Sequence, residues 1–296
     1  MSDRGRAAFP SPDQPTSVAG RMVRFLTRGP VALGLAVVGF LWLIPTFGLL
    51  VSSFRPVAAA TSTGWWTIFT NPSQLTIQNY QGLLEDPGMV SAAWNTLFIT
   101  APSAILMVLI AALAAYAFAW VEFPGRNALF LVVVGLLVVP LQIGLIPVAS
   151  LYNRLGLFGT LPGVWLFHIA FGLPFAVFLL RNFFIGIPHE LLEAARMDGA
   201  GEWKVFTRVV LPLGIPAIAS LLIFQFLWVW NDLLVALVFA GDAKPLTVAI
   251  REQTRAFGGN IDIISTGAFL QMVVPMVVFF SFQRYFVQGL LAGSQK

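Results

Sequence analysis

Six stretches of this 296-residue chain are apolar, and each is long enough to cross a membrane. A transmembrane helix needs about 20 apolar residues to cross the hydrocarbon core of a bilayer, which is about 30 Å thick. Hydrophobic residues make up 58% of the chain and charged residues only 10%, a balance foreign to ordinary soluble domains. The sequence therefore predicts an all-α, polytopic membrane protein with six transmembrane helices, over about residues 31–51, 94–120, 129–151, 161–180, 213–239 and 266–286.

The basic residues predict which loops face the cytoplasm, because cytoplasmic loops of membrane proteins carry an excess of Lys and Arg. If the N-terminus lies inside, twelve of the 17 Lys and Arg residues fall on the cytoplasmic side. We therefore expect a multi-pass protein with both termini in the cytoplasm. Residues 1–30 read as a mostly disordered N-terminal tail, with a surface helix over residues 18–28 as the alternative.

The composition also argues against several kinds of functional site. The net charge of +4 does not indicate nucleic-acid binding, since basic residues on membrane loops give the same sum. The chain has no cysteine, so it has no thiolate nucleophile and no cysteine metal site. His168 has no second histidine at ligand spacing, so no metal site is expected there. We find no pairing of a nucleophile with a base and predict no catalytic residue.

The longest charged passage between apolar stretches runs from Pro188 to Pro212. Pro188 suits the start of a helix, where its missing N–H is not needed. Gly199 suits the end of that helix, because glycine readily takes the left-handed conformation. A second amphipathic turn follows, with apolar residues at helical spacing: Trp203, Phe206 and Val210. The passage predicts a short helix–turn–helix on the cytoplasmic membrane surface.

The same passage resembles the EAA loop of permease subunits of binding-protein-dependent ABC importers. Glu193-Ala194-Ala195 precedes Gly199 by the family's spacing, and Val209 stands where the family usually has Ile. In that family the loop docks into a cleft on the ATP-hydrolysing subunit. The resemblance, over residues 183–212 (here called the EAA loop), implies that the following residues couple to an ATPase: Glu193, Ala194, Ala195, Asp198, Gly199, Leu211 and Pro212. The alternative is an interfacial helix that only anchors a loop between two spans.

The resemblance extends from residue 31 to the C-terminus and is strongest to one permease of carbohydrate importers of the maltose/oligosaccharide type. The passages that carry it include Tyr116-Ala117-Phe118-Ala119, Met197-Asp198-Gly199-Ala200, Trp230-Asn231-Asp232 and Pro245-Leu246-Thr247. It implies the type I ABC importer permease fold, with residues 1–30 as a cytoplasmic tail and residues 31–296 as the transmembrane permease domain.

The resemblance also implies partners and a location. These are a second permease in a heterodimer, a dimer of ATPase subunits that binds ATP and Mg, and an extracytoplasmic sugar-binding protein, all at a bacterial cytoplasmic (inner) membrane and in contact with its lipid. No cofactor of the chain's own is implied. Residues 241–265 would reach toward the binding protein through Gly258, Gly259 and Asn260; the alternative is an ordinary external connector.

Asp232 is the clearest formal charge inside a predicted span, and such charges are costly unless paired or hydrated. With Trp230 and Asn231 it would form part of a polar, aromatic-lined pathway, to which Gln142 and Gln225 are further candidates. The competing interpretations are that Asp232 caps a bend near the external end and that the glutamines bond helix to helix.

Two other functions are possible for a polytopic membrane protein: a secondary transporter and an intramembrane enzyme. A secondary transporter working alone would carry paired ionisable residues at mid-membrane, and an intramembrane enzyme would carry reactive side chains at matching depth. The sequence has neither, and it has no GxxxxGK[ST] phosphate loop, so we expect a conduit driven by another chain's ATP hydrolysis. The solute is predicted to be a di- or oligosaccharide; another solute class, and a binding site in the partner permease, stay open.

Overall fold

The computed structural model describes residues 18–254 and 260–294, with side chains over residues 29–254 and 260–283. Every regular element within these residues is a helix. In chain order they are α1 (Val18–Ser53), α2 (Val57–Ser62), the 3₁₀ helices η1 (Trp65–Phe69) and η2 (Pro72–Gln74), α3 (Gln78–Glu85), α4 (Pro87–Trp120), α5 (Arg126–Leu136), α6 (Leu141–Leu155), α7 (Leu161–Ile185), α8 (His189–Met197), α9 (Glu202–Val205), the π-helix η3 (Phe206–Val210), α10 (Leu211–Trp230), α11 (Leu234–Phe239), α12 (Leu246–Gln253) and α13 (Ile261–Ser294).

Among the described residues, five helices are long and apolar enough to cross a membrane, and the bent pair α5 and α6 would make a sixth span. The chain forms two units, residues 1–51 and residues 52–296. The first unit contributes most of α1, whose segment Gly29–Ser53 is one of the five candidate spans. The predicted tail falls mainly on residues 1–17, outside the described residues, and helix α1 already begins at Val18.

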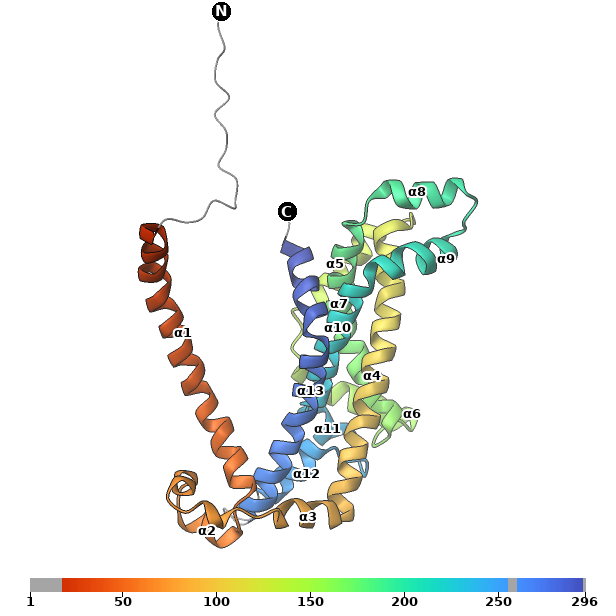
Figure 1. Cartoon of the computed structure of the whole chain (residues 1–296). Coiled ribbons are helices and arrows are strands. Elements are labelled where there is room, and N and C mark those ends of the chain that lie inside the picture. The colour runs from red at the N-terminus through yellow and green to blue at the C-terminus, as the bar shows by residue number, and fades with distance from the viewer. Residues whose placement is uncertain (1–17, 255–259, 295–296) are drawn as a thin grey trace, which may run out of the picture. The chain divides into compact units, whose positions relative to one another are not determined.

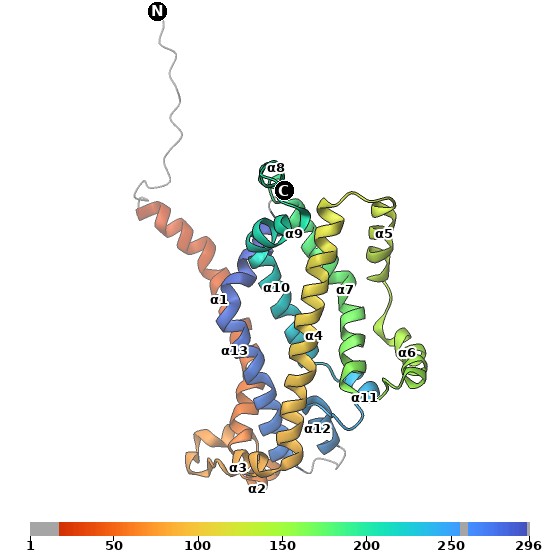
Figure 2. The same cartoon turned by 90° about the vertical axis from the view of Figure 1, so that its right-hand side faces the viewer.

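The second unit is a helix bundle in which α4 packs along α7, and α10 lies against α4, α7 and α13 (Figure 2). Helices α8 and α9 lie at one end of this bundle, and α3 and α12 lie at the other (Figure 1). A buried apolar cluster joins the long helices to the short ones, with Ala115 of α4, Leu180 of α7, Leu221 of α10, Leu192 of α8 and Val205 of α9. The short helices are thus fastened to the bundle by core packing.

Local sequence explains where two of the long helices begin. The Asp86 carboxylate accepts hydrogen bonds from the backbone N–H groups of Gly88 (2.7 Å) and Met89 (3.2 Å), and Pro87 occupies the first turn, where its missing N–H costs nothing. The second span therefore starts seven residues before the predicted residue 94. Thr160 caps α7 in the same way through the N–H of Gly163.

The third predicted span, over residues 129–151, is sharply bent. The structure has two helices there, α5 and α6, which are bent by 101° at the break between them. Pro140 stands directly before α6 with an extended backbone (ψ 135°). Proline has no N–H for the helix ladder and disfavours the helical conformation of the residue before it, so the break falls at this point.

The fifth span is also shorter than predicted, because α10 ends at Trp230 rather than near residue 239. Asn231 ends α10 with φ −93° and ψ 3°, and a separate helix, α11, follows from Leu234. Asp232 therefore lies in the connection between two helices. It is not inside a continuous transmembrane helix.

A buried arginine organises the segment between α1 and α3. The guanidinium of Arg55 donates from Nε to Gln74 Oε1 (3.1 Å) and from Nη2 to the carbonyl oxygen of Ala59 (2.8 Å). It also bonds the side chains of Thr63 and Thr67. Because a buried charge is costly unless its donors are satisfied, these bonds hold α2, η1 and η2 around one point.

Candidate functional site

The EAA loop folds as two short helices joined by a tight turn. Pro188 directly precedes α8, and α8 ends at Met197. Gly199 follows with φ 79°, the left-handed conformation predicted from the sequence, and α9 then begins at Glu202. The predicted helix–turn–helix is confirmed, and it sits at one end of the bundle (Figure 1).

One side of α8 is bound to the bundle core and the other is open. Leu192 is fully buried and Ala195 packs against the same cluster. On the open side, the Glu193 side chain is 61% exposed and Met197 is 88% exposed. The helix therefore presents a mixed apolar and acidic surface away from the bundle.

The residues that the resemblance selects do not all lie on that surface. Glu193, Ala194, Asp198 and Gly199 are exposed, and Ala195 is half-buried against the core. Glu193 Oε1 lies 3.1 Å from His189 Nδ1, one helical turn earlier. The remaining two candidates, Leu211 and Pro212, form the first turn of α10, where Leu211 packs against the core and Pro212 is exposed.

The structure adds three residues that the sequence prediction did not single out: Tyr116, Arg196 and Glu202, here called the Glu202 network. The Tyr116 hydroxyl donates to Glu202 Oε2 (2.5 Å). Arg196 donates from Nε to Glu202 Oε1 (3.1 Å) and from Nη2 to Oε2 (3.3 Å). The hydrogen bond to Glu202 raises the pKa of the Arg196 guanidinium. The network joins α8 and α9 to α4.

Asp232, the first of the predicted pathway residues, caps helix α11. Its carboxylate accepts from the backbone N–H groups of Val235 (3.2 Å) and Ala236 (2.9 Å). Its backbone carbonyl accepts from the Thr247 hydroxyl at 2.7 Å. His168 of α7 is buried, with its Nε2 at 3.7 Å from Asp232 Oδ2. Asp232 thus connects α7, α11 and α12 at one point.

The other predicted pathway residues do not gather around Asp232. Trp230 is buried and exchanges two hydrogen bonds with Gln271 of α13, at 2.9 and 2.8 Å. Asn231 is exposed and donates to the Leu227 carbonyl of its own helix. Gln225 is buried beside Gly172 of α7, and Gln142 is exposed on α6. Trp230 and Gln225 therefore lie against neighbouring helices, and Asn231 and Gln142 are exposed.

Of the three residues predicted at the tip of the 241–265 loop, Gly258 and Gly259 lie outside the described residues. Asn260 is described; it has φ 61° and donates to Gln253 Oε1 at 2.9 Å. Beside this loop lies a groove of about 380 Å³ between the start of α4 and α12, with Asp86, Asn95, Asp242, Lys244 and Glu252 among its lining residues. The lining of the groove mixes polar and apolar residues, and Lys244 is paired with Glu252 at 2.9 Å.

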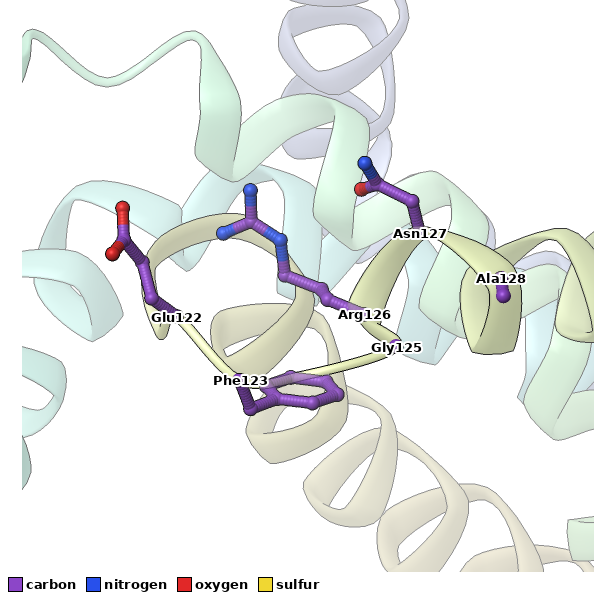
Figure 3. A pocket seen from close by; sticks show the side chains of 6 residues that line it. All are labelled: Glu122, Phe123, Gly125, Arg126, Asn127 and Ala128. Atoms are coloured by element: carbon purple, nitrogen blue, oxygen red, sulfur yellow. The ribbon is translucent and has the colours of Figure 1, made fainter.

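A second hollow, of about 330 Å³, lies at the turn between α4 and α5 (Figure 3). The side chains of Glu122, Arg126 and Asn127 point to the same side of this turn, and Phe123 points away from them. Arg126 is held by a bond from its Nη1 to the Val121 carbonyl (3.2 Å). Residues of the EAA loop do not line this hollow.

Comparison with known proteins gives one family. Residues 88–292 match the family described as binding-protein-dependent transport system inner membrane component. Over 287 residues the chain is 48% identical to the osmoprotective compounds uptake permease protein GgtD of Synechocystis sp., a match that covers 95% of this chain and 96% of that protein.

Two further relatives carry sugars in their names. The chain is 51% identical over 235 residues to the alpha-glucoside transport system permease protein AglG of Rhizobium meliloti, covering 77% of this chain and 62% of that protein. It is 30% identical over 273 residues to the arabinooligosaccharides transport system permease protein AraQ of Bacillus subtilis, covering 91% of this chain and 96% of that protein.

A solved structure shows the same fold. The membrane chain of a bacterial ABC transporter involved in the import of the acidic polysaccharide alginate superposes with a TM-score of 0.78 at 22% identity, covering 92% of this chain and 99% of that one. The fold is thus that of an ABC importer permease. The chain belongs to the family of inner membrane components of binding-protein-dependent transport systems, as a multi-pass permease subunit and not as the ATPase.

Proposed function

We propose that this permease moves a sugar, a di- or oligosaccharide or an α-glucoside, and that its EAA loop docks on a separate ATP-hydrolysing subunit. The single observation that carries the docking proposal is the divided surface of α8. Its inner side is buried in the bundle through Leu192, and its outer side leaves Met197 88% exposed. A helix fixed from behind, with a mixed apolar and acidic front, fits a cleft on another protein, because docking removes the apolar part of that front from water.

The exposed charges on the same surface support recognition of a specific partner. Glu193 is exposed, and its only pairing among the described side chains is with His189, itself exposed. Such a pair contributes little by itself, so Glu193 can exchange His189 for a basic residue of the partner. Ala194 beside it has no side chain beyond Cβ, which lets the partner approach the backbone.

Co-purification tests the docking proposal directly. The tagged chain is extracted from its native membranes in mild detergent, and the co-purifying chains are identified by mass spectrometry. We expect the wild-type chain to retain an ATPase and a second permease. Glu193→Ala and Gly199→Asp should lose the ATPase and keep the permease, while Glu122→Gln, which removes an exposed carboxylate outside the EAA loop, should keep both.

A wild-type chain that purifies alone and still moves a solute would contradict the docking proposal. It would instead favour a transporter that works without an ATPase.

The substrate class is supported by the names of the relatives. AglG and AraQ are named for an alpha-glucoside and for arabinooligosaccharides, and a further relative, SugB of Mycobacterium tuberculosis, for trehalose. GgtD is named for osmoprotective compounds, so a charged osmolyte is the alternative to test. The solutes in the names of AglG, AraQ and SugB are all neutral polyhydroxylated compounds.

Uptake by the complete transporter separates the two substrate classes. Proteoliposomes that contain the purified complex and its binding protein are offered a labelled α-linked disaccharide or a labelled quaternary-ammonium osmolyte. We expect ATP-dependent uptake of the sugar. Uptake of the charged osmolyte alone would overturn the sugar proposal and leave the docking proposal intact.

The partners on the other side of the membrane are part of the same proposal. We infer that a binding protein contacts the groove beside α12, since this groove lies at the opposite end of the bundle from the EAA loop and is lined by the 241–265 loop. A second permease in a heterodimer would then complete the pathway. Both termini are expected in the cytoplasm.

A further inference from the structure

One carboxylate fastens the EAA loop to α4, one of the two 34-residue helices of the bundle. Glu202, the first residue of α9, receives two hydrogen bonds from Arg196 in the last turn of α8 and one from Tyr116 in α4. Both of its oxygens are therefore occupied. The bonds cross the turn at Gly199 and reach a helix that is 86 residues away in sequence.

The same end of α4 contacts α8 a second time. Arg196 Nη2 lies 3.5 Å from the Trp120 carbonyl oxygen, and the Trp120 ring lies 5.6 Å from the His189 ring. Both ends of α8, at His189 and at Arg196, thus touch the last turn of α4. The orientation of α8 is set by α4 as well as by the core beneath it.

Helix α4 also contacts the opposite end of the bundle. Its 34 residues span about 50 Å. Near its start, Asn95 Nδ2 donates to the Lys244 carbonyl (3.2 Å), and Thr96 Oγ1 accepts from the N–H of Leu246 (2.8 Å). These partners belong to the segment that lines the groove beside α12. One continuous helix, α4, therefore connects that groove with the EAA loop.

We propose that Tyr116 and Arg196 are positioning residues, which act through Glu202 to hold the EAA loop on α4 so that movement of α4 is transmitted to the exposed side of α8. This inference rests on the proposed docking of the EAA loop. It adds which contacts inside the permease transmit the movement. Docking itself depends on the outer side of α8, which the Glu202 network does not use.

Because the ion pair of the Glu202 network is partly exposed, we expect it to position the EAA loop while adding little to folding stability. The side chains of Arg196 and Glu202 are 32% and 50% exposed, and exposed ion pairs contribute little to folding stability. Their geometry is nevertheless specific, because the planar guanidinium donates two bonds to one carboxylate. Lysine in place of Arg196 would keep the charge and lose this fork.

The test uses the complete transporter in proteoliposomes with its binding protein, and it measures substrate moved per ATP hydrolysed. Tyr116→Phe is the mildest variant, because it keeps the ring that packs against Phe206 at 5.2 Å and removes only the hydroxyl. Glu202→Gln and Arg196→Gln break the network at its other members. Glu122→Gln serves as the control, since it neutralises an exposed carboxylate at the neighbouring α4–α5 turn.

We expect the three variants to keep the ATPase on co-purification and to keep the thermal midpoint of the wild type. The amount moved per ATP should fall about threefold to tenfold, as befits the loss of a charge-assisted contact. Transport per ATP should fall less in Arg196→Lys than in Arg196→Gln. The double variant Arg196→Glu with Glu202→Arg should recover part of the transport per ATP that either single charge reversal loses. Glu122→Gln should match the wild type.

Wild-type transport per ATP in all three variants would overturn the positioning role. Loss of the ATPase from the purified complex of these variants would also overturn it, because the residues would then be docking contacts. If the wild-type chain itself retained no ATPase, the proposed docking would fail first, and this inference with it.

Discussion

Gly199 carries the turn of the EAA loop because its backbone is left-handed, with φ 79°. The space around it is open, since an added Cβ would meet nothing within 4 Å. Gly199→Ala should therefore cost only the backbone strain of a left-handed residue, about 1 kcal/mol, but it should relax the turn and misplace α8. We expect normal membrane insertion with reduced uptake.

Gly201→Ala is the matched control for this prediction. Gly201 is two residues away, is equally open and has an ordinary φ of −71°. If both alanine variants reduced uptake equally, the cause would be the added methyl group near the partner, and the left-handed backbone would not be what the loop requires.

Asp232 is held by two backbone N–H groups of α11, as a helix cap is. Asp232→Asn keeps one acceptor oxygen, so uptake should fall only modestly. Asp232→Ala removes the cap and should lower stability by about 1 kcal/mol. Uptake and the thermal midpoint in detergent are the two measurements. Complete loss of uptake in Asp232→Asn with normal assembly would make the carboxylate a pathway group.

Single residues could be placed from the sequence where their role depends on their own backbone conformation. Gly199 and Pro188 could be placed because their conformational preferences are intrinsic. The Glu202 network was missed because Tyr116 and Glu202 are far apart in the chain. The one available signal was local: Arg196 and Glu202 carry opposite charges on either side of the predicted turn.

At the scale of elements, two connections meet at a pair of glycines. Gly159 precedes α7 and Gly241 follows α11, and a Cβ on Gly241 would lie 2.7 Å from the Gly159 carbonyl oxygen. Backbone cannot move aside as a flexible side chain can. Gly241→Ala should therefore destabilise by about 1–3 kcal/mol from overpacking, in addition to the strain of its own φ of 55°.

Gly199→Ala is the comparison for Gly241→Ala, since both glycines are left-handed and only Gly241 is crowded. Thermal unfolding of the two purified variants measures the difference. Equal midpoints would show that the close approach of the two connections does not limit stability.

The elements themselves were largely predictable, because a run of about 20 apolar residues has few alternatives to a transmembrane helix. Their ends were not. Hydropathy averages over many residues and passes through Pro140 and Asp232, whereas the structure breaks the chain at both places. The breaks depend on single residues that lack a backbone donor or supply a cap.

At the scale of the whole molecule, the second unit is a bundle with a proposed docking surface at each end. The EAA loop lies at one end and the groove beside α12 at the other, and α4 runs between them (Figures 1 and 2). The family and the fold followed from the sequence, and the comparisons confirm both. The solute did not, because the predicted pathway residues are spread over several helices and a second permease would complete the path.

The most direct test of this account is a thiol at the exposed side of α8, which the absence of native cysteine makes possible. Met197→Cys is compared with Ser91→Cys, an exposed position on the groove at the opposite end of the bundle. Intact cells are treated with a membrane-impermeant thiol reagent, and isolated membranes with a thiol-directed cross-linker. We predict that the thiol at position 91 reacts from outside. The thiol at position 197 should not react, and it should be cross-linked to a separate ATP-hydrolysing chain. A thiol at position 197 that reacts from outside and gives no cross-link would contradict this prediction.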